Sequence, residues 1–182
     1  MLFNSFDFLI FFPIVVCLFF ATPQRYRWAL LLAAGYYFYG CWSVKYLGLL
    51  IATTIIDWAV ALWMDGQEDK KTRRRILLLS LASNIGVLFT FKYFNFFVST
   101  VKSLNIIQEV PTLQLVLPVG VSFYTFQSLA YTIDVYRGKM RAERNLGLFA
   151  AYVSFFPQLV AGPIERPAHL LHQFYERHQI SW

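Results

Sequence analysis

Charged residues in this chain are confined to short clusters, and the runs between them are uncharged and long enough to cross a bilayer. A helix needs about 20 residues to cross the hydrocarbon core, where every backbone polar group must be bonded internally. Hydrophobic residues make up 58% of the 182 residues and charged residues only 14%, whereas soluble domains carry roughly 25% charged residues. The pattern predicts an all-α, polytopic transmembrane fold with broken or re-entrant helices.

Six apolar segments follow one another along a single membrane domain of residues 1–182. They cover approximately residues 8–24, 28–44, 46–64, 76–97, 110–135 and 145–164. Residues 165–182 form an amphipathic tail, for which an interfacial helix is expected. The charged stretch from Asp65 to Arg75 is expected to be a solvated loop. Pro157, Gly162 and Pro163 predict that the sixth segment breaks before its exit or re-enters.

The basic residues predict an orientation. They cluster at Arg25 and Arg27, in residues 65–75 and in residues 137–144, which are alternate loops. Cytoplasmic loops carry the excess of Lys and Arg, so all three loops are expected in the cytoplasm. This predicts a multi-pass membrane protein with an extracytoplasmic N-terminus. The net charge of +6 does not predict nucleic-acid binding, because no basic face with interleaved aromatics remains outside the apolar segments.

The stretch from Leu117 to Gly138, LPVGVSFYTFQSLAYTIDVYRG, differs from a plain membrane anchor. Pro118 and Gly120 interrupt a helix near its start. A helix after Gly120 would place four polar residues on one face, at spacings of three, four and three: Tyr124, Gln127, Tyr131 and Asp134. A polar stripe at membrane depth is expected to face a cavity or other helices rather than lipid.

Asp57 lies in the middle of the third apolar segment. An ionisable residue at such depth is a functional candidate. The alternative is a carboxyl group that stabilises packing by hydrogen bonding to a neighbouring helix. Both interpretations are open at this point.

The other chemistry-bearing residues do not form a recognisable catalytic or metal site. His169 and His172 share a helix face, but neither they nor His178 match a zinc-binding spacing. We therefore expect surface histidines, no metal site and no bound cofactor. Cys17 and Cys41 lie in or beside apolar runs and are expected to be buried.

Two long motifs support a resemblance to a known family. PVGVSFYTFQSLAYTIDVYRG and YVSFFPQLVAGPIERP resemble the paired signature of the membrane-bound O-acyltransferase family, in its bacterial alginate O-acetyltransferase branch. MLFNSFDFLIFFPIV, YYFYGCW and FKYFNFF resemble the same branch, so the resemblance covers the whole chain. Members are typically more than twice as long. The chain therefore resembles the N-terminal portion of such an enzyme, and nothing in it corresponds to the family's active-site histidine.

The resemblance implies a helical core around a tunnel, through which an acyl group, usually acetyl, passes from a cytoplasmic donor to an extracytoplasmic acceptor. The donor would be a thioester, either acetyl-CoA or an acyl carrier. Polar side chains in a water-poor channel would orient its carbonyl group. Candidate lining residues are Tyr124, Gln127, Tyr131, Asp134, Gln158, Glu165 and Arg166. For each, hydrogen bonding between helices is the alternative.

The implied partners are membrane lipid and the extracytoplasmic acetyl-transfer proteins of a polysaccharide modification complex. A separately encoded C-terminal half is a further expected partner. Two other functions stay open: an ion-coupled transporter or channel subunit, suggested by broken helices and Asp57, and a non-catalytic remnant of an acyltransferase.

Overall fold

The computed structural model describes residues 5–103, 118–159 and 165–176, and within those ranges every regular element is helical. The α-helices are α1 Phe6–Ala21, α2 Arg27–Gly40, α3 Val44–Asp65, α4 Lys70–Leu88, α5 Phe94–Ser103, α6 Val121–Tyr136, α7 Leu146–Val153, α8 Phe156–Leu159 and α9 Pro167–Gln173. A 3-10 turn, η1, covers Gln24–Tyr26, and a π-helical turn, η2, covers Phe89–Tyr93 between α4 and α5. The all-α prediction is confirmed for this part of the chain.

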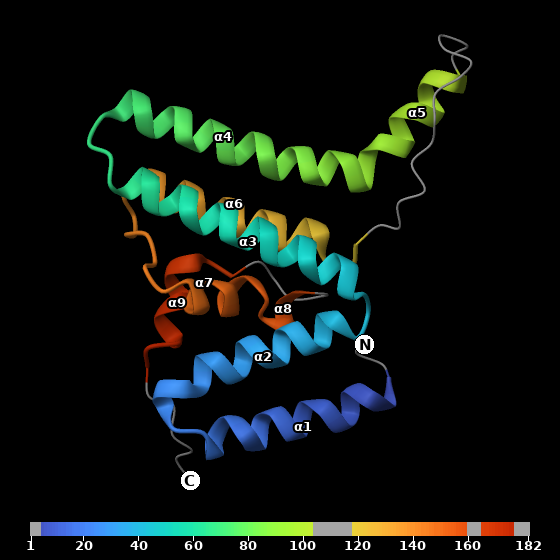
Figure 1. Ribbon diagram of the computed structural model, residues 1–182, viewed down its shortest axis with the longest axis vertical. Coiled ribbons are helices and arrows are strands. Elements are labelled where there is room, and N and C mark those ends of the chain that lie inside the picture. The colour runs from blue at the N-terminus through green and yellow to red at the C-terminus, as the bar shows by residue number, and fades with distance from the viewer. Residues whose placement is uncertain (1–4, 104–117, 160–164, 177–182) are drawn as a thin grey trace.

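The long helices lie side by side in a layered bundle (Figure 1). From the bottom of that view the order is α1, α2, the short helices α7 to α9, then α3 with α6 behind it, and α4 at the top. The most extensive contacts join α4 to α6, α2 to α7 and α3 to α4. The short helices therefore form the middle of the bundle, and α6 is held by α3 and α4.

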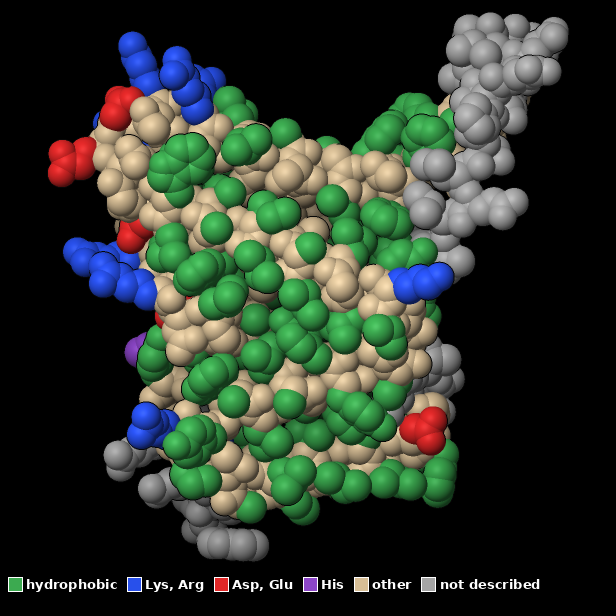
Figure 2. All heavy atoms as spheres, in the orientation of Figure 1, with side chains coloured by type: hydrophobic (Ala, Val, Ile, Leu, Met, Phe, Trp, Pro, Cys, Tyr) green, Lys and Arg blue, Asp and Glu red, His purple; other side chains and the backbone are tan. Residues whose placement is uncertain are grey.

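Charged side chains gather at one end of the bundle. The turns after α1, α3 and α6 all lie at the left end of Figure 1, and Figure 2 shows most Lys and Arg side chains along that edge. Green hydrophobic side chains cover the broad face between the two ends. Two helical stretches, Val44–Asp65 and Lys70–Thr100, are long and apolar enough to cross a membrane by length and composition, and α1 is a shorter apolar helix.

The expected loop from Asp65 to Arg75 is wrong for most of its length. Helix α3 continues to Asp65, and α4 begins at Lys70. The Asp69 side chain accepts hydrogen bonds from the backbone N–H groups of Lys71 at 3.2 Å and Thr72 at 2.9 Å. This N-cap starts the helix within the charged stretch, so the basic residues that follow form its first turns.

The sixth apolar segment is interrupted in the middle of the bundle. Helix α7 ends at Val153, and the chain turns through Ser154 and Phe155 into α8. A Cβ atom on Gly35 would fall on the Ser154 carbonyl oxygen, so α2 packs against this turn with no room for a side chain. Residues 160–164, with Gly162 and Pro163, lie outside the described residues, as do residues 177–182 with His178.

The cysteines are not buried, contrary to expectation. Cys17 and Cys41 are both exposed. Helix α1 contacts its neighbours through Phe8, Phe11 and Val15, which pack against Phe38 and Phe156. Only that narrow face of α1 is covered, and Cys17 lies outside it.

Candidate functional site

The start of α6 is fixed by Gly120. This residue precedes the helix in the left-handed conformation, with φ of 73°, which favours glycine. A Cβ atom there would also collide with the Leu159 carbonyl oxygen at the end of α8. The break predicted at Pro118 and Gly120 thus sets the first turn of α6 directly against α8.

The polar face of α6 is packed inside the bundle. Tyr124, Gln127 and Tyr131 are 1%, 4% and 0% exposed. The Gln127 amide Nε2 donates to the Tyr152 carbonyl oxygen at 2.8 Å and reaches Gln158 Oε1 at 3.4 Å. In return, the Tyr152 hydroxyl donates to the Gln127 carbonyl oxygen at 3.2 Å. Among the described residues, these side chains therefore link α6 to the broken segment.

Tyr131 forms a hydrogen bond with Glu143, a residue that was not among the predicted site residues. The Glu143 backbone N–H donates to the Tyr131 hydroxyl at 2.8 Å, and its carbonyl oxygen accepts from Trp58 Nε1 at 2.8 Å. Its carboxylate accepts from the Asn145 N–H and from the Tyr175 hydroxyl, both at 2.9 Å. Partial burial and this hydrogen bond raise the pKa of Tyr175 to about 12, so the phenol remains a donor at neutral pH. Glu143 thereby connects α3, α6 and the turn that follows α9.

Tyr124 differs from the other members of the stripe. Its hydroxyl group is buried and has no hydrogen-bond partner among the described residues, and the same holds for the hydroxyl of the adjacent Thr125. A buried hydroxyl without a partner costs about 1–3 kcal/mol. The interior of α6 thus presents hydroxyl groups whose bonding is incomplete in the described part of the chain.

Three of the predicted site residues meet at the basic end of the bundle. Asp134, Glu165 and Arg166 line a cavity of about 360 Å³ between the end of α6 and the start of α9. Arg137 and Lys139 line it as well. Three cations and two carboxylates give this cavity a net charge of about +1. We call it the basic-end cavity.

The carboxylates of the basic-end cavity are already engaged. Lys139 Nζ lies 3.7 Å from Asp134 Oδ1, and His169 Nδ1 lies 3.4 Å from Glu165 Oε2. Arg137 and Arg166 are exposed. The cavity can therefore attract an anionic group from solvent through its cations, while Tyr124, Gln127 and Tyr131 lie deeper in the bundle and do not line it.

Asp57 lies between α3 and α4, and its carboxyl group also interacts with Ser128 of α6. It is completely buried, and its Oδ1 accepts from Asn84 Nδ2 at 2.6 Å and from Ser80 Oγ at 3.2 Å. Its Oδ2 has no hydrogen-bond partner among the described residues. A small cavity of about 30 Å³ borders Asp57 and Asn84. The contacts seen here are those of the packing interpretation, and the functional one stays a prediction.

The two described histidines lie on the surface. His169 and His172 are exposed, and each faces a glutamate four residues away, Glu165 and Glu176. In residues 5–103, 118–159 and 165–176, no three His, Cys, Asp or Glu side chains lie together as a metal site would require.

These features define the structural class of the protein. The protein is an all-α bundle with hydroxyl, amide and carboxyl groups between its helices and a cationic cavity at one end. No protein-family profile matches the chain, and no solved structure matches it.

The chain is similar to curated bacterial O-acetyltransferases over part of their length. The chain is 40% identical over 97% of its length to the probable alginate O-acetylase AlgI of Azotobacter vinelandii. It is 40% identical over 97% of its length to the protein of that name from Pseudomonas aeruginosa. It is 32% identical over 81% of its length to the peptidoglycan O-acetyltransferase of Helicobacter pylori. The chain spans 36%, 35% and 32% of these relatives, respectively. It is thus a relative of bacterial O-acetyltransferases, as its motifs predicted, through a partial match to their N-terminal part.

Proposed function

We propose that this chain is the N-terminal part of an integral membrane O-acyltransferase that moves acetyl groups across the inner membrane. The acceptor would be an exopolysaccharide such as alginate. The observation that carries the proposal is the sequence relationship over 97% of the chain to proteins named alginate O-acetylase.

The proposed membrane placement is multi-pass, with the N-terminus outside the cytoplasm. Two helical stretches have the length and composition to cross a bilayer, and the exposed side chains of α1 are mostly apolar, with Asp7 in its first turn as the exception. The three basic turns lie at the same end of the bundle (Figures 1 and 2). That arrangement supports a cytoplasmic location for this end, because Lys and Arg are enriched in cytoplasmic loops.

The basic-end cavity is proposed to receive the acyl donor. A thioester donor such as acetyl-CoA or an acyl carrier bears phosphate groups, and Arg137, Lys139 and Arg166 supply the positive charge to attract them. The Tyr124 hydroxyl and its polar neighbours on α6 would line the path of the acetyl group beyond the cavity. The catalytic histidine implied by the family resemblance is proposed to lie outside these 182 residues.

The proposed partners are extracytoplasmic acetyl-transfer proteins and the remaining part of the enzyme. The relatives are roughly three times as long as this chain. The unpartnered hydroxyl groups of Tyr124 and Thr125 are consistent with an interior that further helices complete.

Donor binding can be tested in membrane vesicles that contain the complete gene product. We expect Lys139→Ala and Arg166→Ala each to raise the KM for radiolabelled acetyl-CoA roughly three- to tenfold, with a smaller effect on kcat. Arg141→Ala is the matched control. Arg141 is exposed and lies in the same loop as Lys139, but it does not line the cavity. The differences should shrink in high salt, because exposed charges are then screened.

Two outcomes separate the parts of the proposal. Equal KM values in all four proteins would remove the basic-end cavity as the donor site and leave the acyltransferase assignment standing. Unmodified vesicles that transfer no acetyl group, although the protein is present and folded in them, would contradict the assignment itself.

A further inference from the structure

Two neighbouring cavities near α1 form one continuous binding site in our interpretation. The first, of about 120 Å³, lies between η1, α2 and α9 and includes Gln24, Arg27 and Phe174 in its lining. The second, of about 220 Å³, lies between α1 and α8 and is lined by apolar side chains. Phe19, Leu31 and Phe155 line both. The two cavities therefore lie next to each other, with these three side chains in common.

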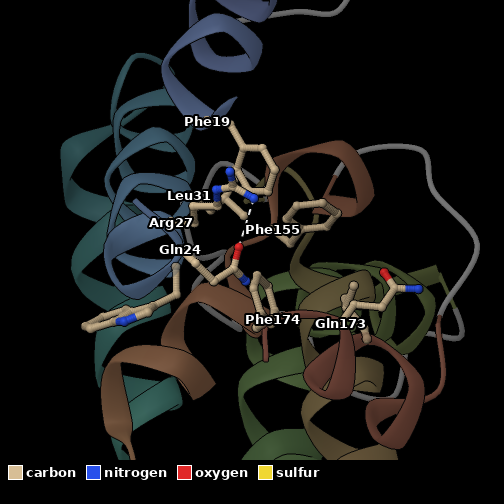
Figure 3. A pocket seen from close by; sticks show the side chains of 9 residues that line it. Phe19, Gln24, Arg27, Leu31, Phe155, Gln173 and Phe174 are labelled. Atoms are coloured by element: carbon tan, nitrogen blue, oxygen red, sulfur yellow. Dashed lines mark hydrogen bonds between the residues drawn. The ribbon is translucent and has the colours of Figure 1, made fainter. Parts of the chain in front are cut away.

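The first cavity holds a fixed positive charge. Arg27 Nη1 donates to Gln24 Oε1 at 2.8 Å, and Arg27 Nε donates to the Thr22 carbonyl oxygen at 3.1 Å. Its guanidinium carbon lies 4.8 Å from the centre of the Phe19 ring. Figure 3 shows the Arg27 and Gln24 side chains surrounded by Phe19, Phe155 and Phe174. Of the described residues that line either cavity, Arg27 alone carries a formal charge.

The second cavity is open along the apolar outer face of α1. Phe12, Val16 and Phe20 line it and are 45%, 37% and 41% exposed. In the proposed membrane placement this face meets lipid, and the Arg27 end lies at the basic, cytoplasmic end of the bundle. A site with a cation at the interface and an apolar channel running into the membrane matches a phospholipid in both charge and depth.

We propose that these joined cavities bind one anionic phospholipid, with its phosphate at Arg27 and part of an acyl chain between α1 and α8. The inference rests on the membrane placement of the proposed function. The guanidinium is held by Gln24 and Thr22, so it loses little side-chain entropy when the phosphate binds. The apolar cavity contributes van der Waals contacts between the acyl chain and the side chains of α1 and α8, because the chain is in apolar surroundings whether bound or free.

The test is lipid retention by the complete protein after purification in detergent and exposure to mixed vesicles. The vesicles contain equal amounts of phosphatidylglycerol and phosphatidylethanolamine, and bound lipid is counted by native mass spectrometry. We expect the unmodified protein to retain one phosphatidylglycerol. Arg27→Gln should lower that retention about fivefold. Arg25→Gln, a neighbouring exposed arginine outside the cavities, should leave it unchanged.

A second pair of variants tests the acyl-chain cavity without touching the charge. Val16→Trp should fill the second cavity and reduce phosphatidylglycerol retention to background. Leu18→Trp, on an exposed part of α1 that lines neither cavity, should have no effect. Thermal melts of each variant check that the fold is intact.

Different results would contradict the membrane placement and the lipid site. A protein that carbonate washing releases from membranes would contradict the membrane placement. A membrane-embedded protein that retains both lipids equally, with and without Arg27, would overturn only the lipid site. Displacement of the lipid by soluble glycerol phosphate would overturn the acyl-chain component, because a headgroup site alone would then suffice.

Discussion

Asp57 is a buried carboxyl group that has no cationic partner among the described residues. Asn84 and Ser80, one turn apart on α4, both donate to its Oδ1. Removing an acceptor of this kind leaves buried donors unsatisfied, at a cost of about 1–3 kcal/mol each. The contacts made by Asp57 thus explain its position as a link between α3 and α4.

We expect Asp57→Leu and Asn84→Leu each to lower the free energy of unfolding in detergent by about 1–3 kcal/mol. The double variant should cost much less than the sum of the two, because both changes break the same hydrogen bond. Asp57→Asn keeps the size and an acceptor oxygen and should stay close to the unmodified protein. The measurement is unfolding monitored by circular dichroism.

Additive losses in the double variant would contradict the packing role. Loss of polysaccharide acetylation by Asp57→Asn with unchanged stability would instead support the functional interpretation. The sequence could single out Asp57 by its depth alone. It could not identify Asn84 and Ser80 as partners, because that pairing depends on how α3 and α4 align in space.

The first turns of α4 show that amino-acid composition alone does not predict where a helix begins. A cluster of charges predicted a loop, yet Asp69 begins a helix there. The signal was present as Asp69 followed by Thr72, whose hydroxyl donates to Asp69 Oδ2 at 2.7 Å. The onset of α6 was predictable because Gly120 and Pro118 carry strong local conformational preferences.

The Asp69 cap should make stability depend on pH. Hydrogen bonds from the Thr72 hydroxyl and from the Thr72 and Lys71 N–H groups hold the pKa of Asp69 below its ordinary value. The stabilisation of the fold by the ionised Asp69 cap is therefore fully present above the pKa that Asp69 has in the unfolded chain. It is lost as the pH falls through the lower pKa that Asp69 has in the folded protein. Asp69→Asn can still cap the helix but does not titrate.

We expect the Tm of the unmodified protein in detergent to fall relative to that of Asp69→Asn as the pH is lowered from 7 to 3. Melting curves across this range provide the measurement. Thr72→Ala, which removes the first of these hydrogen bonds, should reduce the pH dependence. Identical pH profiles for the unmodified protein and Asp69→Asn would show that the cap contributes nothing measurable.

The whole molecule has two chemically different ends, and the cysteines can report on them. Cys41 ends α2 at the side opposite the basic turns, and it is exposed. Cys17 lies within the apolar helix α1. Arg141, in the loop between α6 and α7, is exposed at the basic end.

Single-cysteine versions of the complete protein should label differently in spheroplasts. We expect a membrane-impermeant maleimide to react with Cys41 in intact spheroplasts and with Arg141→Cys only after permeabilisation. Cys17 should react poorly in both, since the reactive thiolate forms in water. The reverse pattern for Cys41 and Arg141→Cys would invert the proposed orientation.

The tertiary arrangement of the site was the least predictable part. Asp134, Glu165 and Arg166 were candidates on separate motifs, and the structure brings them into one cavity. Glu143 was missed because two of its four contacts use backbone atoms, which do not depend on residue type, and all four depend on where the loop before α7 lies. Local preferences predict where helices begin, whereas such contacts follow from packing.

Helix α7 ends inside the bundle. A helix that stops in the middle of a bundle leaves carbonyl groups that water would ordinarily solvate. Here the Gln127 amide donates to the Tyr152 carbonyl oxygen at 2.8 Å. The Ala150 carbonyl oxygen accepts from the Ser154 backbone N–H at 2.9 Å and also from the Ser154 hydroxyl at 2.7 Å. The Gln127 side chain thus takes the place of a water molecule at the Tyr152 carbonyl group. The bundle therefore holds a helix end in its interior, where Tyr152 and Ser154 are buried. In the proposed acyltransferase, such an interior would protect a reactive acyl group from hydrolysis.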